Sequence, residues 1–218
     1  MTQHRQAAFS LLEVVIVMIL IAIGSAAAAP MVGRWNEKQN FKSAGREAAS
    51  LIGYARSQAV RTGDVHVVFF DTDAQGNGLT DSNGDPVPML VLNDGVPGSA
   101  NQNCKIDGGE PTRTLNGITG VSWGLTSTAG KVGTDNGDGN HADGWSFEDP
   151  DGNDSNWLLF RPQGVPFSFA PDCDLGDSGS GGGAIYFTDG KGDQAVVITP
   201  LGSVRVHVWR NSVTAWSS

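Results

Sequence analysis

The feature that most constrains the fold of this chain is an uninterrupted run of 20 residues without charge, from Val14 to Gly33. At about 1.5 Å of rise per residue, such a run forms a helix about 30 Å long, which is enough to cross a lipid bilayer. A short polar and basic stretch, residues 1–8, precedes it. We therefore predict a membrane-spanning helix near the N-terminus, followed by a separate globular part.

Glu13 stands at the front edge of this apolar run. An ordinary secretory signal would account for the basic start and for the small residues Ala26–Ala29, but it does not account for a carboxylate at this place. An acid in the bilayer centre costs about 2.5 to 3.5 kcal/mol, and less near an interface, so Glu13 is a candidate functional residue. Position alone leaves the alternative open that Glu13 simply lies among lipid headgroups.

Charge is divided unevenly along the 218 residues. Residues 1–63 carry seven Lys/Arg and three acids, a net charge of +4, whereas residues 64–218 carry seven Lys/Arg and twenty acids, a net charge of -13. A surface of that sign repels phosphate backbones, which argues against nucleic acid as the main partner of the globular part.

A helical pattern continues beyond the apolar run. From Phe41 onwards, small or apolar residues recur at helical spacing. They are Ala44, Ala48, Leu51, Ile52, Ala55 and Ala59. The pattern predicts one helix from Phe9 to Thr62, whose second half can seat a globular domain. Gly63 is suited to a left-handed C-cap that ends it.

After Gly63 the hydrophobic period becomes extended, and Gly, Asp, Asn and Pro punctuate the apolar runs. The predicted strands are residues 65–70, 89–92, 121–123, 157–160, 184–188, 195–199 and 204–209. We predict an α+β fold in which the C-terminal half of the long helix packs against antiparallel β-sheets. The predicted segments are residues 1–8, 9–33, 34–63 and 64–218, the last being the β-rich globular domain.

The residues Phe9-Ser10-Leu11-Leu12-Glu13, preceded by the small Ala8 and followed by the apolar helix, resemble the class III signal of type IV pilins and type II secretion pseudopilins. The resemblance implies that residues 1–8 are a leader, that a prepilin peptidase cuts between Ala8 and Phe9, and that Phe9 is then N-methylated. Glu13 becomes the fifth residue of the mature chain. Ala8 departs from the glycine that is usual at this place.

The same resemblance implies an assembly role for Glu13 and Pro30. A Phe9 ammonium inside an apolar filament core is costly unless a carboxylate neutralises it, so Glu13 of a neighbouring subunit is expected to pair with it and to set the register of subunit addition. Pro30 falls where pilin helices commonly carry a kinking proline, because proline removes one helical hydrogen bond. The alternative is that Pro30 ends the membrane span.

Further stretches resemble pseudopilins of the GspH/FimT type. They are Tyr54–Gly63 leading into Val65–Val67, and then Phe160–Gly164, Ala184–Gly190 and Val196–Arg205. Residues 71–155 match nothing. Some members of this family bind DNA through a basic Gly-Arg-x-Arg segment. Here the corresponding residues are Gly202-Ser203-Val204-Arg205, in which one arginine is replaced, and this adds to the argument against nucleic acid.

Cys104 and Cys173 lie beyond the predicted membrane segment, on the side that would be periplasmic. That oxidising space favours a disulfide, which would close a loop of 69 residues and stabilise the fold by about 4 kcal/mol. Two independent free thiols are the alternative.

Acidic residues alternate through the loop that contains Asp71, Asp73, Asn77 and Asp81. Oxygen ligands two residues apart with a nearby glycine suit calcium. The spacing does not complete an EF-hand, because Ser82 stands where the bidentate glutamate would be. The alternative is Asx-type turns in hairpin loops.

No catalytic constellation emerges from the sequence. Gly176-Asp177-Ser178-Gly179 superficially resembles the nucleophile loop of chymotrypsin-like proteases, but no histidine stands in a protease-like context. We predict that the chain is not an enzyme and needs no cofactor, with calcium as the one ion to test.

The resemblance therefore predicts a minor pseudopilin of a type II secretion filament. Its expected partners are other pilins in the filament tip or shaft, the prepilin peptidase, the inner-membrane assembly platform and, before assembly, membrane lipid. The expected location is the inner membrane, single-pass, with the domain in the periplasm, and then a periplasmic or surface filament. One alternative is a minor pilin of a type IV pilus, for priming, twitching, adhesion or DNA uptake. Another is a single-span periplasmic binding module or enzyme.

Overall fold

The computed structural model describes residues 11–115, 121–126, 129–139, 141–210 and 214–217, with the backbone alone for residues 26–38 and 210. The chain divides into two units, which meet between Gln39 and Asn40. The boundary lies inside one continuous helix, so that the helix contributes residues to both units.

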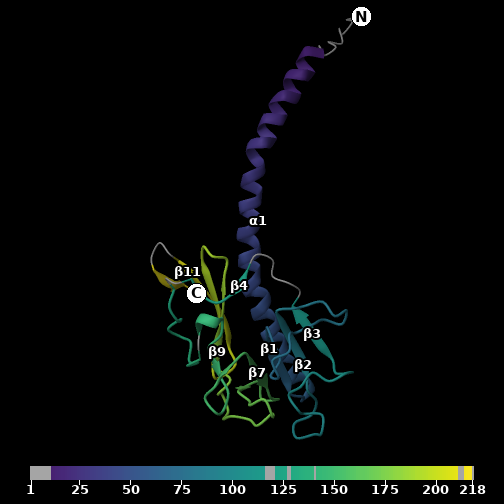
Figure 1. Cartoon of the computed structure of the whole chain (residues 1–218), viewed down its shortest axis with the longest axis vertical. Helices are drawn as coiled ribbons and strands as arrows, with labels where there is room; N and C mark the ends of the chain where they lie inside the picture. The colour runs from purple at the N-terminus through teal and green to yellow at the C-terminus, as the bar shows by residue number, and fades with distance from the viewer. Residues whose placement is uncertain (1–10, 116–120, 127–128, 140, 211–213, 218) are drawn as a thin grey trace, which may run out of the picture. The chain divides into compact units, whose positions relative to one another are not determined.

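Helix α1 runs from Leu11 to Thr62 (Figure 1). Its helical assignment continues through Pro30, so the helix does not end there. It ends as the sequence predicts: Gly63 adopts a φ of 79°, and its N–H donates to the carbonyl of Ala59 at 3.1 Å. A left-handed residue closes the last turn in this way, and glycine takes that conformation without steric penalty.

Within the described residues, no helix combines the length and the apolar character that crossing a membrane requires. Of the predicted spanning segment 9–33, Phe9, Ser10 and the side chains of residues 26–33 lie outside the description.

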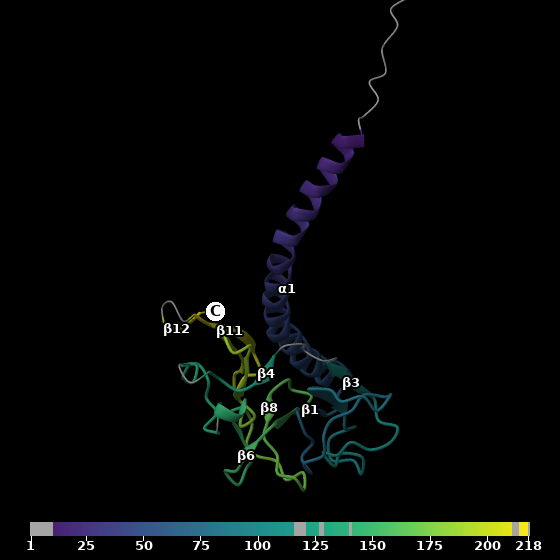
Figure 2. The ribbon, with the colours of Figure 1, turned by 45° about the horizontal axis from the view of Figure 1, so that its top comes forward.

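Two five-stranded sheets follow the helix, and all strand pairs are antiparallel. The first sheet has the order β3 (Thr112–Leu115), β2 (Met89–Asn93), β1 (His66–Phe70), β7 (Trp157–Phe160) and β8 (Pro166–Phe167). The second has the order β12 (Ala215–Ser217), β11 (Val204–Arg210), β10 (Asp193–Ile198), β9 (Gly183–Thr188) and β4 (Ser122–Trp123) (Figure 2). A two-stranded sheet, β5 (Phe147–Glu148) with β6 (Asp154–Ser155), and a short 3-10 helix, η1 (His141–Asp143), complete the described elements.

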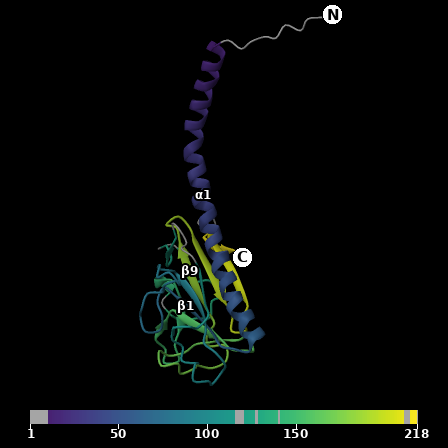
Figure 3. The ribbon, with the colours of Figure 1, turned by 90° about the vertical axis from the view of Figure 1, so that its right-hand side faces the viewer.

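The C-terminal half of α1 packs against these sheets, as the sequence predicts (Figure 3). Its small and apolar side chains share one buried cluster with residues of both sheets. The cluster includes Ala48, Leu51, Ile52, Ala55 and Ala59 of the helix, Val68 and Phe70 of β1, and Ile185, Phe187 and Val196 of β9 and β10. The fold is therefore α+β and pilin-like.

One glycine shows how closely the helix approaches β10. A Cβ on Gly45 would overlap the side-chain oxygen of Gln194, whose Nε2 donates to the carbonyl of Phe41 at 2.8 Å. A side chain at this position would require Gln194 to move and to give up its hydrogen bond to the helix, so glycine allows this close contact.

Each of the seven predicted strands corresponds to an observed one, with ends that differ by up to two residues. Strands β3, β5, β6, β8 and β12 were not predicted. They contain two to four residues each, which is too short for hydrophobic alternation to identify them.

Candidate functional site

The N-terminal part of α1 presents apolar side chains to its surroundings. Large apolar residues from Leu11 to Ile23 are exposed, with 83% of Leu11, 66% of Met18 and 63% of Ile23 accessible. Contiguous apolar surface of this kind marks an interaction site, whereas single exposed apolar residues are ordinary. We call residues Leu11–Ser25 the apolar segment.

Glu13 is the one charged residue of the apolar segment, and its side chain is exposed. It lies in the first turn of the described helix, where a carboxylate interacts favourably with the helix dipole. Its predicted partner, Phe9, and the predicted cleavage residue Ala8 lie outside the described residues. For Pro30 the structure gives the helical backbone alone.

The predicted disulfide is confirmed: Cys104 and Cys173 are bonded, with Cα atoms 5.4 Å apart. Asp94 lies beside it, fully buried, with a carboxylate oxygen within 4.8 Å of the two sulfur atoms. The backbone N–H groups of Asn103 and Cys104 both donate to this carboxylate. Since the sulfur atoms are joined to each other, they are not available as thiolate ligands for a metal.

Burial raises the pKa of Asp94 to about 6. The two backbone N–H groups oppose this effect, while the nearby charges of Glu110 and Asp107 add to it. Asp94 is therefore a buried carboxyl group whose charge the fold stabilises only in part.

The residues predicted for calcium lie in hydrogen-bonded loops. Asp73 accepts hydrogen bonds from the backbone N–H groups of Gln75 and Asn77, at 2.9 and 2.8 Å, and from the side-chain amide of Asn77. Asp81 accepts the equivalent bonds from residues 83 and 85, which hold its pKa below its usual range. The interpretation as Asx-type turns is thus confirmed for Asp73 and Asp81.

Asp71 is exposed and has a φ of 66°. Among the described residues, no three acidic, histidine or cysteine side chains gather within 4.8 Å of one another except Asp94 with the two disulfide-bonded cysteines. Calcium binding by Asp71, Asp73, Asn77 and Asp81 stays a prediction.

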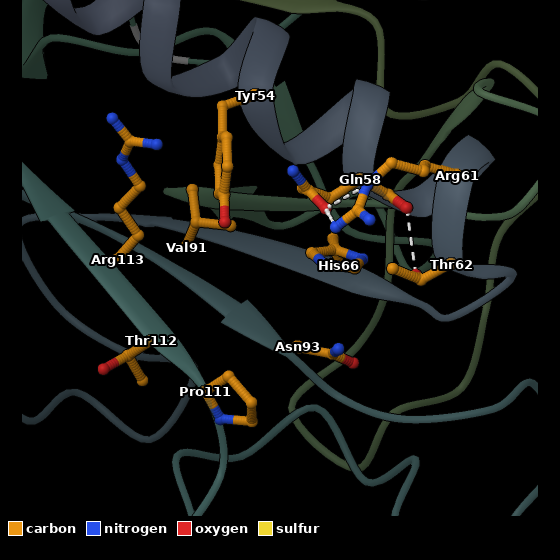
Figure 4. Close-up of a pocket in the computed structure, with 10 residues that line it drawn as sticks. All are labelled: Tyr54, Gln58, Arg61, Thr62, His66, Val91, Asn93, Pro111, Thr112 and Arg113. Atoms are coloured by element: carbon orange, nitrogen blue, oxygen red, sulfur yellow. Dashed lines mark hydrogen bonds between the residues drawn. The ribbon is translucent and has the colours of Figure 1, made fainter.

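A pocket of about 180 Å³ lies between the last turns of α1 and the first sheet (Figure 4). We call it the α1–β3 pocket. Its lining comes from the helix end, from β1 and β2, and from β3 with the residue before it. The residues are Tyr54, Gln58, Arg61, Thr62, His66, Val91, Asn93, Pro111, Thr112 and Arg113.

Two arginines dominate the charge of this pocket. The guanidinium carbon of Arg113 lies 4.3 Å from the centre of the Tyr54 ring, a cation–π geometry. The Nε of Arg61 donates to the side-chain oxygen of Gln58 at 3.0 Å, and its Nη2 donates to the same oxygen. Figure 4 shows Arg113 and Arg61 on opposite sides of the pocket.

His66 forms part of the pocket wall and is 4% exposed. Burial lowers the pKa of this imidazole, an effect that the backbone and charge of Asp64 oppose and the charge of Arg61 reinforces. His66 is therefore neutral at neutral pH. Asp64 is held by Asn93, whose Nδ2 donates to its carboxylate at 3.1 Å.

Sequence analysis did not single out the pocket arginines as functional residues. Arg61 was part of a stretch that resembles pseudopilins, and Arg113 lies on β3, a strand that was not predicted. No local pattern relates the two positions, and only the packing of α1 on the first sheet brings them to one pocket.

The family model of the prokaryotic N-terminal methylation motif matches residues 3–29 of this chain. The chain carries a type IV pilin-like signal. The match includes Ala8, Phe9 and Glu13, and it supports a type IV pilin-like protein that is processed by prepilin peptidase and assembles with other pilins. No curated protein and no solved structure matches the chain.

Proposed function

We propose that this chain is a minor pseudopilin of a type II secretion filament and that it works by assembly, without catalysis. One observation carries the proposal. The exposed apolar segment, with Glu13 as its only charge, coincides with the part of the chain that matches the N-terminal methylation motif.

The physical reason for assembly is the exposed apolar surface. Burying one large aliphatic side chain is favourable by about 1.5 to 3 kcal/mol, and the apolar segment carries a row of them. Lipid would cover this surface before assembly, and the helices of neighbouring subunits would cover it in a filament. The hydrophobic free energy of the apolar segment therefore changes little when a subunit moves from lipid into the filament. Pairing between charged groups can then decide when a subunit joins.

Glu13 supplies that pairing in our proposal. After cleavage at Ala8, the ammonium group of Phe9 would enter an apolar filament core, where an unpaired charge costs about 3 to 5 kcal/mol. The carboxylate of Glu13 on a neighbouring subunit would neutralise it, which fixes the axial position of each added subunit.

The proposed location is the inner membrane, with a single span and the domain in the periplasm, from which the assembly platform extracts the subunit. The Cys104–Cys173 disulfide supports an oxidising compartment for the domain. The net charge of -13 over residues 64–218 favours secretion over a DNA-binding pilus role.

The N-terminus and Glu13 provide the test. Mass spectrometry of the chain from its own cells should find N-methylated Phe9 as the first residue. Glu13→Leu should abolish incorporation into filaments, whereas the control Glu47→Leu, at an exposed position on the same helix, should leave incorporation unchanged. The proposal would be refuted if the chain still began with Met1 and if Glu13→Leu had no effect on the protein. These results would favour an anchored protein that does not polymerise.

A deletion strain separates secretion from pilus function. We expect loss of protein secretion with twitching intact. Loss of twitching with normal secretion would instead assign the chain to a type IV pilus.

A further inference from the structure

The α1–β3 pocket holds two arginines, Arg61 and Arg113, for which the described part of the chain provides no ion-pair partner. Neither Arg61 nor Arg113 forms a salt bridge within the described residues, although residues 64–218 carry thirteen more acids than Lys/Arg. Two acids adjoin the lining in the chain, and both already accept hydrogen bonds. Asp64 accepts one from the side-chain amide of Asn93, and Glu110, next to Pro111, accepts one from the backbone N–H of Asp107 at 3.1 Å. The pocket is thus a local positive site on an otherwise acidic domain.

The side chains around the pocket also hold the two guanidinium groups in place. Arg113 rests on the Tyr54 ring, and Arg61 is anchored by Gln58. A guanidinium fixed in this way loses less side-chain entropy when it binds a carboxylate, and it presents paired N–H donors that match the two carboxylate oxygens. The side-chain amide of Gln58 and the hydroxyl of Thr112 add neutral donors to the lining.

We propose that the α1–β3 pocket binds an acidic side chain of a partner polypeptide. Its volume of about 180 Å³ is that of a side-chain site and lies below the range of pockets for larger ligands. The proposal concerns the domain alone and does not depend on processing or filament assembly at the N-terminus.

The edge of the first sheet favours a polypeptide as the source of the carboxylate. Strand β3 ends that sheet, and no described strand pairs with its outer side. Thr112 and Arg113 on this strand are exposed and line the pocket. An extended segment that pairs with β3 through its main chain would bring its own side chains to the pocket mouth.

The charge of the domain argues against a polyanion in this place. A nucleic acid or an anionic membrane would bring many charges near a surface with a net charge of -13. A single carboxylate would be attracted by the two arginines, and with only one charge it would be repelled far less than a polyanion by the acidic surface of the domain. At neutral pH, His66 contributes no charge to the pocket because burial keeps it neutral.

Peptide titration of the full-length chain in detergent micelles tests the proposal. The probe is a blocked pentapeptide, Thr-Val-Glu-Val-Thr, and its control has Gln in place of Glu. We expect saturable NMR shifts of the Arg61 and Arg113 side-chain N–H groups with the Glu peptide, and binding that weakens as salt rises. Arg61→Gln and Arg113→Gln should each weaken binding by about tenfold. Arg205→Gln, an exposed arginine on β11, should not change it.

Four results would overturn the proposal. They are the absence of saturable shifts, equal binding of the Gln peptide, unchanged binding by both pocket variants, and tighter binding of inorganic phosphate or acetate than of the peptide. The last would make the pocket a site for free anions. Arg113→Lys covers the case in which Arg113→Gln fails to fold. This variant keeps the positive charge but lacks the paired N–H donors of a guanidinium group, so it should bind the Glu peptide more weakly than the unaltered chain.

Discussion

Neutralising the buried carboxyl group beside the disulfide should change how the stability of the domain depends on pH. In Asp94→Asn, the side chain keeps nearly the same shape and can still accept hydrogen bonds from the N–H groups of Asn103 and Cys104. What it loses is the ability to carry a charge. Comparing the two chains across pH therefore isolates the free energy of ionising Asp94 in the folded state.

The magnitude follows from the pKa of Asp94, which burial raises from 3.8 to about 6. Because the folded chain holds the proton more tightly than the unfolded chain, folding is most favourable when Asp94 is protonated. The unfolding free energy therefore falls as pH rises from about 4 to about 6, by about 3 kcal/mol in total, and the loss persists at higher pH. For a chain of this size, about 3 kcal/mol corresponds to roughly 6 to 12 °C in melting temperature.

Urea unfolding at constant ionic strength, followed by near-ultraviolet circular dichroism with the disulfide intact, would measure this difference. Relative to the natural chain, Asp94→Asn should gain about 3 kcal/mol of stability between pH 4 and pH 7.5. Glu148→Gln is the comparison. Burial also raises the pKa of Glu148, but this side chain is only half-buried, so its variant should change the pH profile in the same direction and by less than Asp94→Asn. Parallel pH profiles of Asp94→Asn and the natural chain would refute the reasoning.

Two further predictions concern covalent and steric constraints. Reducing the bond between Cys104 and Cys173, which closes a loop of 69 residues, should lower the unfolding free energy by about 4 kcal/mol, and an unchanged denaturation midpoint in reductant would contradict this. Gly202→Ala should destabilise the domain by about 1 to 3 kcal/mol, because Gly202 has a φ of 79° and its added Cβ would collide with the carbonyl of Gly164. Gly190→Ala, at a φ of 76° with open space around it, should cost less in the same thermal unfolding assay, and equal losses would exclude the collision as the cause.

The sequence was most informative where the chemistry is local. The end of α1 follows from Thr62 and Gly63, since a glycine after the last helical turn takes the left-handed conformation at no steric cost. The interior strands β1, β9 and β10 also follow from the sequence, because each contains an apolar run that is buried on both faces of its sheet. The assembly signal around Phe9 and Glu13 likewise lies in consecutive residues, and the methylation motif matches it.

Local sequence was ambiguous where one residue pattern serves two purposes. Asp73, with Asn77 four residues later and a glycine between them, has the oxygen spacing of a calcium loop and also that of an Asx-type turn. In the structure, the carboxylate of Asp73 accepts hydrogen bonds from three N–H donors in its own loop. The same arrangement recurs at Asp149 with Asn153, so turn formation accounts for part of the acidic composition.

The sequence by itself determined the long helix, its capped end, the apolar strands and the N-terminal signal, because each depends on neighbours within a few residues. The tertiary structure alone decided the α1–β3 pocket. Strand β3 has no alternating apolar pattern and exists because it pairs with β2, with Arg113 opposite Val91. That register places Arg113 beside Tyr54 of α1, and the packed helix places Arg61 in the same lining. Long-range backbone pairing and helix packing fix these positions, and neither leaves a signature in a short stretch of residues.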